Sequence, residues 1–190
     1  MALLTITRIG EITKVLEAIS RSIAIKLKKN NPESDVDVEV LEYGIAMKLN
    51  KYGVILITVT LGTIFGHLYE SILALVALAA IRRFSGGAHF SSLTACMIMS
   101  SLFCVITPMI LLSKTTAVVL TLVSVCIYYF RAPNWFEELT VQKNDILYKY
   151  IAMLIASGNL ILQSSVIAIV LFVQALTLLP KGGVKDEKEH

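Results

Sequence analysis

The chain has 190 residues, of which 56% are hydrophobic and 16% are charged, and its mean hydropathy is +0.74. These values lie outside the range of soluble domains of this length, so the composition predicts an integral membrane protein of the all-α class. The formal net charge of +3 comes from scattered residues and gives no support to nucleic-acid binding.

Residues 1–30 are predicted to form an amphipathic surface helix. Its apolar residues recur at steps of three and four, which places them on one stripe: Ile9, Ile12, Leu16, Ile19 and Ile23. Two interpretations are equally open, namely a helix packed against the rest of the protein and a helix lying on the cytoplasmic membrane surface. Pro32 predicts that the helix ends at or before Asn31.

Residues 41–180 are predicted to form a transmembrane helical bundle, followed by a polar tail over 181–190. Lys114 marks the turn between two apolar blocks that each have the length of one crossing. The two outer blocks have 29 and 31 residues, too long for one upright helix and short for two against a hydrocarbon core of about 30 Å. The four apolar blocks are residues 53–81, 94–112, 115–130 and 150–180.

The distribution of positive charge favours two crossings in each outer block. With about six transmembrane helices, some of them short or re-entrant, 16 of the 17 Lys and Arg residues are cytoplasmic. With single crossings, five of the 17 move outside. Polar breaks at Gly66-His67 with Glu70, and between Ser157 and Ser165, support the first arrangement. We therefore expect one multi-pass membrane domain over residues 1–190, with both termini and the loop 82–93 on the cytoplasmic side.

A polar island interrupts the apolar sequence between Arg82 and Cys96. Cysteine and histidine form the minimal pair for thiol nucleophilic catalysis, because the imidazole can take the thiol proton. On one continuous helix, His89 and Cys96 would lie two turns, about 10.5 Å, apart, which is too far for proton transfer. The loop must therefore fold back for the two side chains to meet.

Local sequence permits such a fold. Gly86-Gly87 allows backbone conformations closed to other residues, and Ser91 or Ser92 can cap a helix that begins near Leu93. Cys96 would then lie in the first helical turn, where the helix dipole favours the thiolate. The alternative is that Cys96 is a small buried apolar residue and His89 an ordinary loop residue.

The motif R-x-x-x-G-G-x-H-x₆-C, at the start of a predicted transmembrane segment, resembles the signature of the accessory gene regulator protein B (AgrB) family. The resemblance covers most of the chain, and this spacing is its most specific part. It implies a bacterial cytoplasmic-membrane cysteine endopeptidase that cleaves a small propeptide and promotes its cyclisation into a quorum-sensing autoinducing peptide. The N-terminal part of the propeptide would be held as a thioester before it cyclises.

The resemblance also implies roles for individual residues. Cys96 corresponds to the nucleophile and His89 to the general base, while Arg82, Ser85, Gly86 and Gly87 would shape the site or bind substrate. It implies neither a cofactor nor a metal ion. The loop 131–149 departs from the family pattern, since Lys143 and Lys149 are well separated and Glu137-Glu138 lie in the middle of the loop, so propeptide selection is expected to differ.

The sequence leaves open a third catalytic residue and one alternative function. No acidic or amide residue lies near the motif in sequence, although Asn159 or another distant residue could complete a triad. Cys104 and Cys126 are expected to be helix-packing residues, and the three cysteines are too few for a disulfide framework. The rival function is a non-catalytic transporter or assembly factor. The expected partners are the propeptide, the lipid bilayer and a second copy of the chain.

Overall fold

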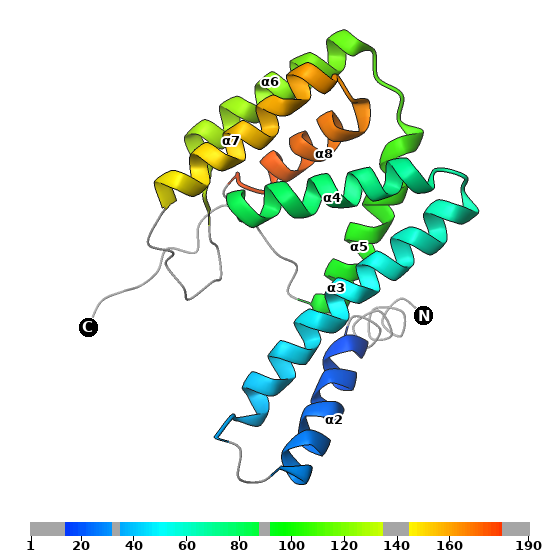
Figure 1. Cartoon of the computed structure of the whole chain (residues 1–190), viewed down its shortest axis with the longest axis vertical. Helices are drawn as coiled ribbons and strands as arrows, with labels where there is room; N and C mark the ends of the chain where they lie inside the picture. The colour runs from blue at the N-terminus through cyan, green and yellow to red at the C-terminus, as the bar shows by residue number, and fades with distance from the viewer. Residues whose placement is uncertain (1–13, 32–34, 88–91, 135–144, 180–190) are drawn as a thin grey trace, which may run out of the picture. The chain divides into compact units, whose positions relative to one another are not determined.

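A computed structural model of the protein describes residues 14–31, 35–87, 92–134 and 145–179 (Figure 1). Within these ranges the regular structure is helical, with one isolated bridge between Gly86 and Asn134 and no strand. The all-α class predicted from the composition is therefore confirmed. The helices are α2 (Val15–Asn30), α3 (Val38–Ile64), α4 (Leu68–Ser85), α5 (Leu93–Ile106), η1 (Thr107–Met109), α6 (Lys114–Arg131), α7 (Asp145–Leu162) and α8 (Ser165–Leu176).

Three of the described helices, α3, α6 and α7, are long and apolar enough to cross a membrane. At about 1.5 Å per residue, the 27 residues of α3 span roughly 40 Å. The segment Leu93–Met109 and helix α8 are apolar but shorter. The protein is thus a membrane protein with long and short apolar helices, and the count of six crossings stays a prediction.

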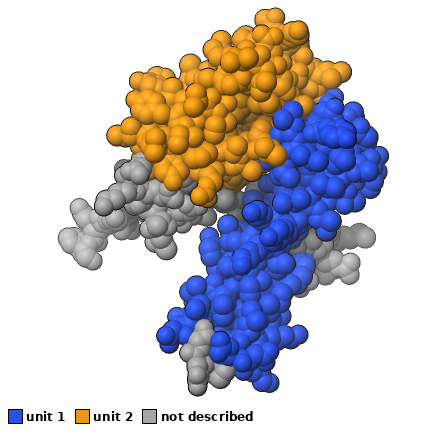
Figure 2. All heavy atoms as spheres, in the orientation of Figure 1, with its two compact units in different colours: residues 1–75, 89–109 blue, residues 76–88, 110–190 orange. Residues whose placement is uncertain are grey.

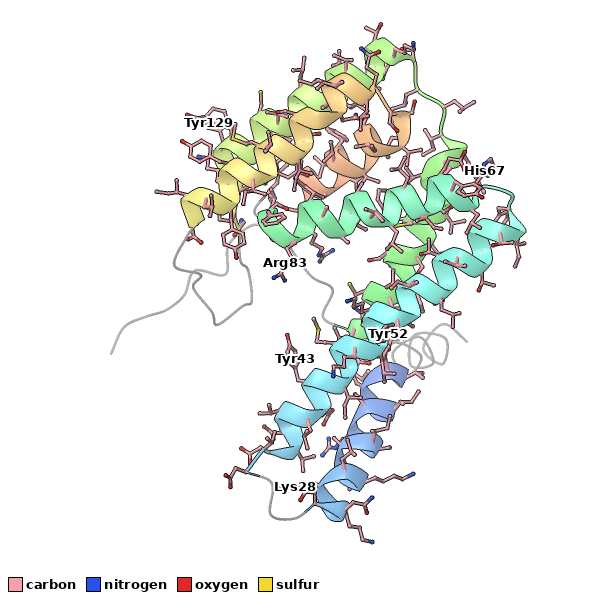
Figure 3. The ribbon with its side chains drawn as sticks, in the orientation of Figure 1. Lys28, Tyr43, Tyr52, His67, Arg83 and Tyr129 are labelled. Carbon is pink, nitrogen blue, oxygen red and sulfur yellow. The ribbon has the colours of Figure 1, made fainter. Side chains whose placement is uncertain are left out.

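Both outer apolar blocks are broken into two helices where polar residues interrupt them. The first break separates α3 from α4, with Gly66 at φ +73° and His67 at the turn (Figure 3). The second separates α7 from α8, where Gln163 adopts φ +51° and Ser164 accepts a hydrogen bond from the N–H of Ile167. The second break is narrower than predicted, because residues 157–159 remain helical.

The chain divides into two compact units (Figure 2). The first comprises residues 1–75 and 89–109, and the second comprises residues 76–88 and 110–190. Helix α4 contributes to both units, and the single-domain assignment stays a prediction.

In the first unit, α2 packs against α3 and α5 through Leu16, Ser20 and Ala24, which are buried. Of the predicted apolar stripe, Leu16 is buried, whereas Ile19 and Ile23 are exposed. Small side chains at a four-residue spacing allow closer helix approach than isoleucines would. The interpretation of α2 as a packed helix is therefore correct, and its exposed isoleucines leave contact with a membrane surface open.

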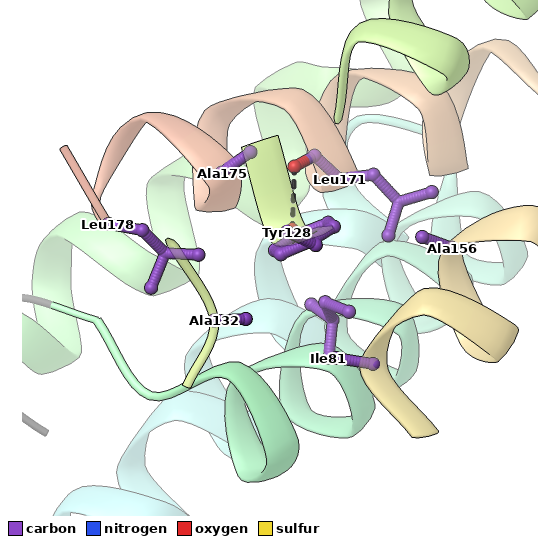
Figure 4. Packing of buried hydrophobic residues seen from close by; sticks show 8 residues of the cluster. Ile81, Tyr128, Ala132, Ala156, Leu171, Ala175 and Leu178 are labelled. Carbon is purple, nitrogen blue, oxygen red and sulfur yellow. Dashed lines mark hydrogen bonds between the residues drawn. The ribbon is translucent and has the colours of Figure 1, made fainter. Parts of the chain in front are cut away.

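The second unit has its core around Tyr128 of α6. The phenolic O–H of Tyr128 donates a hydrogen bond of 2.8 Å to the backbone oxygen of Leu171 on α8 (Figure 4). A buried tyrosine that finds such an acceptor keeps both its apolar ring and its polar end satisfied. The core thereby joins the end of α4 to α6, α7 and α8; its buried members are Ile81, Tyr128, Ala132, Ala152, Ala156, Leu171, Ala175 and Leu178.

Candidate active site

Cys96 lies at the end of the first turn of α5, as predicted. The helix begins at Leu93, and Ser92 is its N-cap, whose side-chain oxygen accepts a hydrogen bond of 3.4 Å from the N–H of Ala95. The N–H of Cys96 donates to the backbone oxygen of Ser92 at 3.0 Å and closes the turn. The side chain is buried, and its Sγ lies 4.0 Å from the hydroxyl of Ser100. The thiol thus stands near the positive end of the helix dipole.

The N-terminus of α5 is tied to α2 by the carboxylate of Glu17. Oε1 of Glu17 accepts hydrogen bonds from the N–H of Leu93 at 2.7 Å and from the hydroxyl of Ser92 at 3.0 Å. Oε2 accepts from the hydroxyl of Thr94 at 2.9 Å. In return, Thr94 Oγ1 accepts a hydrogen bond of 2.9 Å from the N–H of Leu16, in the first turn of α2. Each helix therefore supplies a cap for the other.

Glu17 is stabilised in its charged form at this junction. Burial raises the pKa of Glu17, but hydrogen bonds from its own backbone N–H, the Thr94 hydroxyl, the Leu93 N–H and the Ser92 hydroxyl together outweigh that effect. The net pKa of Glu17 lies below its ordinary value. At neutral pH the cysteine helix therefore begins beside a carboxylate.

The glycine pair follows the C-terminus of α4 in the second unit. Gly86 adopts φ +67° and its N–H donates to the backbone oxygen of Arg82 at 3.0 Å, a common way for a helix to end. Gly87 follows at φ +124°. Ser85, Gly86 and Gly87 are all buried, while Arg82 is half-buried and Arg83 exposed, pointing away from α4 (Figure 3).

Two distant residues hold this segment in place. Asn134 pairs with it along the backbone, donating from its N–H to Ser85 O at 2.9 Å and accepting from the N–H of Gly87 at 2.9 Å. The Nδ2 of Asn134 also donates to the backbone oxygen of Leu178 at 3.3 Å. From α8, the Nε2 of Gln174 donates to Gly86 O at 2.7 Å. The polar groups of this buried segment are thus paired, as burial requires.

Gly87 has no room for a side chain. A Cβ built at this position would lie 2.6 Å from Thr177 Oγ1 and 2.8 Å from Gln174 Nε2. The backbone angle and the neighbouring atoms therefore both require glycine. Glycine at this position thus fixes the local backbone, and its role in shaping a catalytic site stays a prediction.

The structure brings some of the predicted site residues together and not others. Arg82, Ser85, Gly86 and Gly87 lie together at the C-terminal end of α4 in the second unit, whereas Cys96 belongs to the first unit. His89 lies outside the described residues, as do Ser91 and most of the loop that departs from the family pattern, residues 135–144. The roles assigned to these residues stay predictions.

Sequence reasoning missed Glu17, Thr94, Asn134 and Gln174. The contacts of Glu17 to α5 join residues 75 to 77 positions apart, and no local pattern marks them. A signal did exist for Gln174, since an amide inside the apolar segment 165–176 is costly without a partner. Asn134 follows Ala132-Pro133 in the chain, but nothing in the sequence connects it to the glycine pair.

The structure also shows what surrounds three other residues considered from the sequence: Asn159, Cys104 and Cys126. Asn159 is buried and uses both ends of its amide, since Nδ2 donates to Thr121 Oγ1 at 2.8 Å and Oδ1 accepts from the N–H of Ser164 at 3.1 Å. Asn159 thereby joins α6, α7 and the start of α8.

Cys104 is buried, as expected, but Cys126 is exposed on α6, so the assignment of Cys126 as a packing residue was wrong. All three cysteines are free thiols.

Comparison with known proteins gives one family and one relative. The family described as accessory gene regulator B matches residues 20–179. An AgrB-like protein of Halalkalibacterium halodurans is 27% identical over 89 residues, which cover 47% of this chain and 45% of that protein. The chain thus matches about half the length of this curated relative. No solved structure matches the chain.

Proposed function

We propose, from the premise that the chain belongs to the accessory gene regulator B family, that it is a membrane-embedded cysteine endopeptidase. Its substrate would be a small propeptide, which it would cleave and help to cyclise into a quorum-sensing autoinducing peptide. Family membership supports a role in peptide processing, and the catalytic mechanism is our proposal. The single structural observation that carries it is the position of Cys96 at the end of the first turn of α5.

The proposed reaction begins with transfer of the Cys96 thiol proton to His89. The thiolate attacks the carbonyl carbon of the scissile peptide bond, and the imidazolium then returns a proton to the leaving amine. The C–N bond breaks, and the N-terminal part of the propeptide remains as a thioester on Cys96. A thiol or hydroxyl within that peptide attacks the same carbonyl, closes the ring and restores the cysteine.

These reaction steps need no nucleotide as an energy source when the product is a thiolactone. Ring closure then exchanges one thioester for another of similar free energy. The first step, from amide to thioester, is uphill, so release of the C-terminal fragment or tight binding of the propeptide must drive it. We therefore propose a reaction without a cofactor or a metal ion.

The anchoring of the glycine pair supports the placement of His89 in this mechanism. Gly87, two residues before His89, is fixed by the N–H contact to Asn134 and by close packing against Thr177 and Gln174. Because the backbone is fixed at Gly87, fewer conformations are open to the residues that follow it. Arg82, in the last turn of α4, would bind acidic groups of the propeptide.

The proposed topology places this chemistry at the cytoplasmic face. Six crossings, with α5 and α8 as the short ones, keep both termini and the loop 82–93 on that side and satisfy the positive-inside rule. The catalytic loop would meet a propeptide made in the cytoplasm. A second copy of the chain remains a proposed partner.

The test is cleavage of any small peptide found encoded beside this chain's gene, with both expressed in one membrane system. Cys96→Ser and His89→Ala should abolish cleavage, because one lacks the thiol and the other the base. Ser100→Ala is the matched control, since Ser100 neighbours Cys96 and has no role in the proposed reaction. Cleavage by a properly inserted Cys96→Ser protein at the wild-type rate would favour the non-catalytic transporter or assembly factor.

A further inference from the structure

We propose that the second unit binds the headgroups of anionic phospholipids at the end where α6 stops and α7 begins. The central contact would be Lys149, whose ammonium lies over the ring of Tyr129. The exposed residues Arg83 and Arg131 add positive charge at the same end. This binding concerns the lipid of one bilayer leaflet and does not depend on the proposed catalytic reaction.

Aromatic contacts show that three helix ends meet here. The ring of Phe84, in the last turn of α4, lies 5.7 Å from the ring of Tyr148, in the first turn of α7. The Nζ of Lys149 lies 4.5 Å from the ring centroid of Tyr129, which is close to the end of α6 at Arg131 (Figure 3). The last turns of α4 and α6 and the start of α7 therefore share one end of the second unit.

Aromatic side chains mark this end as the one at a membrane–water boundary. Tyr129, Phe130 and Tyr150 are exposed there. In contrast, residues 114–127 of α6 and 151–162 of α7 contain no aromatic residue. Tyrosine is enriched at such boundaries because its ring is apolar and its hydroxyl is polar. We infer that this end lies at the depth of the lipid headgroups.

Positive charge has the same uneven distribution. Four of the five basic residues described in the second unit lie at this end: Arg82, Arg83, Arg131 and Lys149. Lys114, the first residue of α6, is the fifth. Asp145 is the one acidic residue among those that the structure describes in this unit. Residues 135–144, outside the described part, add one lysine and two glutamates, so positive charge remains in excess. Basic residues at this depth attract anionic headgroups.

Lys149 is the best placed of these cations to bind a phosphate group. Its side chain is half-buried between α6 and α7, and attraction to the face of Tyr129 holds its ammonium in place. An ammonium has three N–H donors, and the ring can occupy only some of them. The others can donate to the anionic oxygens of a phosphate, which gives short, charge-assisted hydrogen bonds.

The apolar face of α7 favours a lipid over a soluble phosphate or an acidic peptide. Tyr150, Leu154 and Ile161 are exposed and share one face of the helix, since they are spaced by four and seven residues. This face runs from the aromatic end toward the other end of the unit. A phospholipid supplies both partners at once, with its phosphate on Lys149 and its acyl chains along the exposed face.

The experiment counts the lipids that stay bound to the full-length protein. The protein is purified in a neutral detergent with equal amounts of phosphatidylglycerol, which is anionic, and phosphatidylcholine, which is neutral overall. Native mass spectrometry then gives the ratio of the two lipids retained. The wild type should prefer phosphatidylglycerol, and Lys149→Gln should lower this preference about fivefold, the size expected for one lysine near an anionic surface. A wild type without the preference would overturn the proposal.

Lys114→Gln is the matched control, because it makes the same change at the opposite end of α6. The two ends of this helix are about 26 Å apart, so the preference should be unchanged. Equal losses in Lys114→Gln and Lys149→Gln would indicate diffuse attraction to net charge and would overturn a site at this end. If Lys149→Gln does not fold, Arg83→Gln replaces it, and a folded Arg83→Gln protein should also show a weaker preference.

Two variants of Tyr129 and one soluble competitor complete the test. Tyr129→Phe keeps a ring under the ammonium and should retain the preference, whereas Tyr129→Leu keeps every charge but should weaken it. Equal preference in these two variants would contradict a role for the ring in holding Lys149. An excess of sn-glycerol 3-phosphate should leave the bound phosphatidylglycerol in place, because it has no acyl chains. Displacement would assign the site to a soluble phosphate and overturn the lipid as its partner.

Discussion

The side-chain Nε2 of Gln174 donates a hydrogen bond of 2.7 Å to the backbone oxygen of Gly86, across 88 positions of the chain. Gln174 is buried on α8, and Gly86 ends α4 beside the motif that carries the predicted histidine. A polar side chain inside an apolar helix is tolerated where it has such a partner. The contact therefore links the core of the second unit to the backbone that precedes His89.

Replacement of Gln174 tests this link. Gln174→Met keeps a similar volume but leaves the buried Gly86 oxygen without this donor, an expected loss of about 1–3 kcal/mol in the free energy of unfolding. Thermal unfolding in detergent, followed by circular dichroism, measures the change. Leu176→Met, on an exposed position of the same helix, is the matched control and should be close to neutral. Equal stability of the two variants would show that the contact contributes little.

Gly87→Ala should disrupt the same segment by another route. The new Cβ would meet Thr177 and Gln174, and alanine would have to adopt φ +124°. The strain should lower the free energy of unfolding by about 1–3 kcal/mol, with loss of cleavage as the segment shifts. Gly44→Ala is the control, since nothing lies within 4 Å of its added Cβ, and helix propensity should make it stabilising by about 0.5–1 kcal/mol. A fully active, stable Gly87→Ala protein would be the contrary result.

Asn159→Leu should destabilise the protein without affecting catalysis specifically. The substitution removes hydrogen bonds to Thr121 and to Ser164, and it leaves the part-buried N–H of Ser164 without this acceptor, so we expect a loss of about 1–3 kcal/mol. Cleavage should be normalised to the amount of folded protein. A rate per folded molecule near that of wild type is expected, and a selective loss in a stable variant would instead return Asn159 to the role of third catalytic group.

Acid should weaken the junction between α2 and α5. Because the pKa of Glu17 in the folded protein lies below its ordinary value of 4.5, its charge stabilises the fold above that value. The stabilisation falls as the pH drops through the lowered pKa and is absent below it. The difference in unfolding temperature between wild type and Glu17→Gln should thus be full at neutral pH and vanish in strong acid. A difference that stays constant over this range would contradict the assignment.

Local features of the structure followed from the sequence to a large extent. Pro32 predicted the end of α2, Ser92 predicted the start of α5, and Gly66 predicted the break between α3 and α4. Each of these residues acts on the backbone of its own neighbours in the chain. Cys96 fell in the first helical turn for the same reason. Caps, breakers and turns are short-range signals, and a single sequence contains them.

Features that depend on distant residues could not be predicted in this way. The sequence left open whether the apolar stripe of α2 faces the protein or a membrane surface. In the structure Leu16, Ser20 and Ala24 are buried while Ile19 and Ile23 are exposed, because the choice of face depends on which side chains let α3 and α5 approach. Where a helix contacts lipid, apolar side chains gain little by packing against protein instead. Hydrophobic periodicity is therefore a weaker guide to the packed face of a helix in a membrane protein. Glu17 resembled any exposed acidic residue until its partner helix was known.

The central claim is tested most directly by intact-mass analysis of the purified protein after co-expression with any small peptide found encoded beside its gene. A hydroxylamine-sensitive mass increase equal to an N-terminal fragment of that peptide is expected on the wild type and absent from Cys96→Ala. An increase on both proteins, or loss of the precursor at equal rates with neither modified, would contradict a thioester at Cys96.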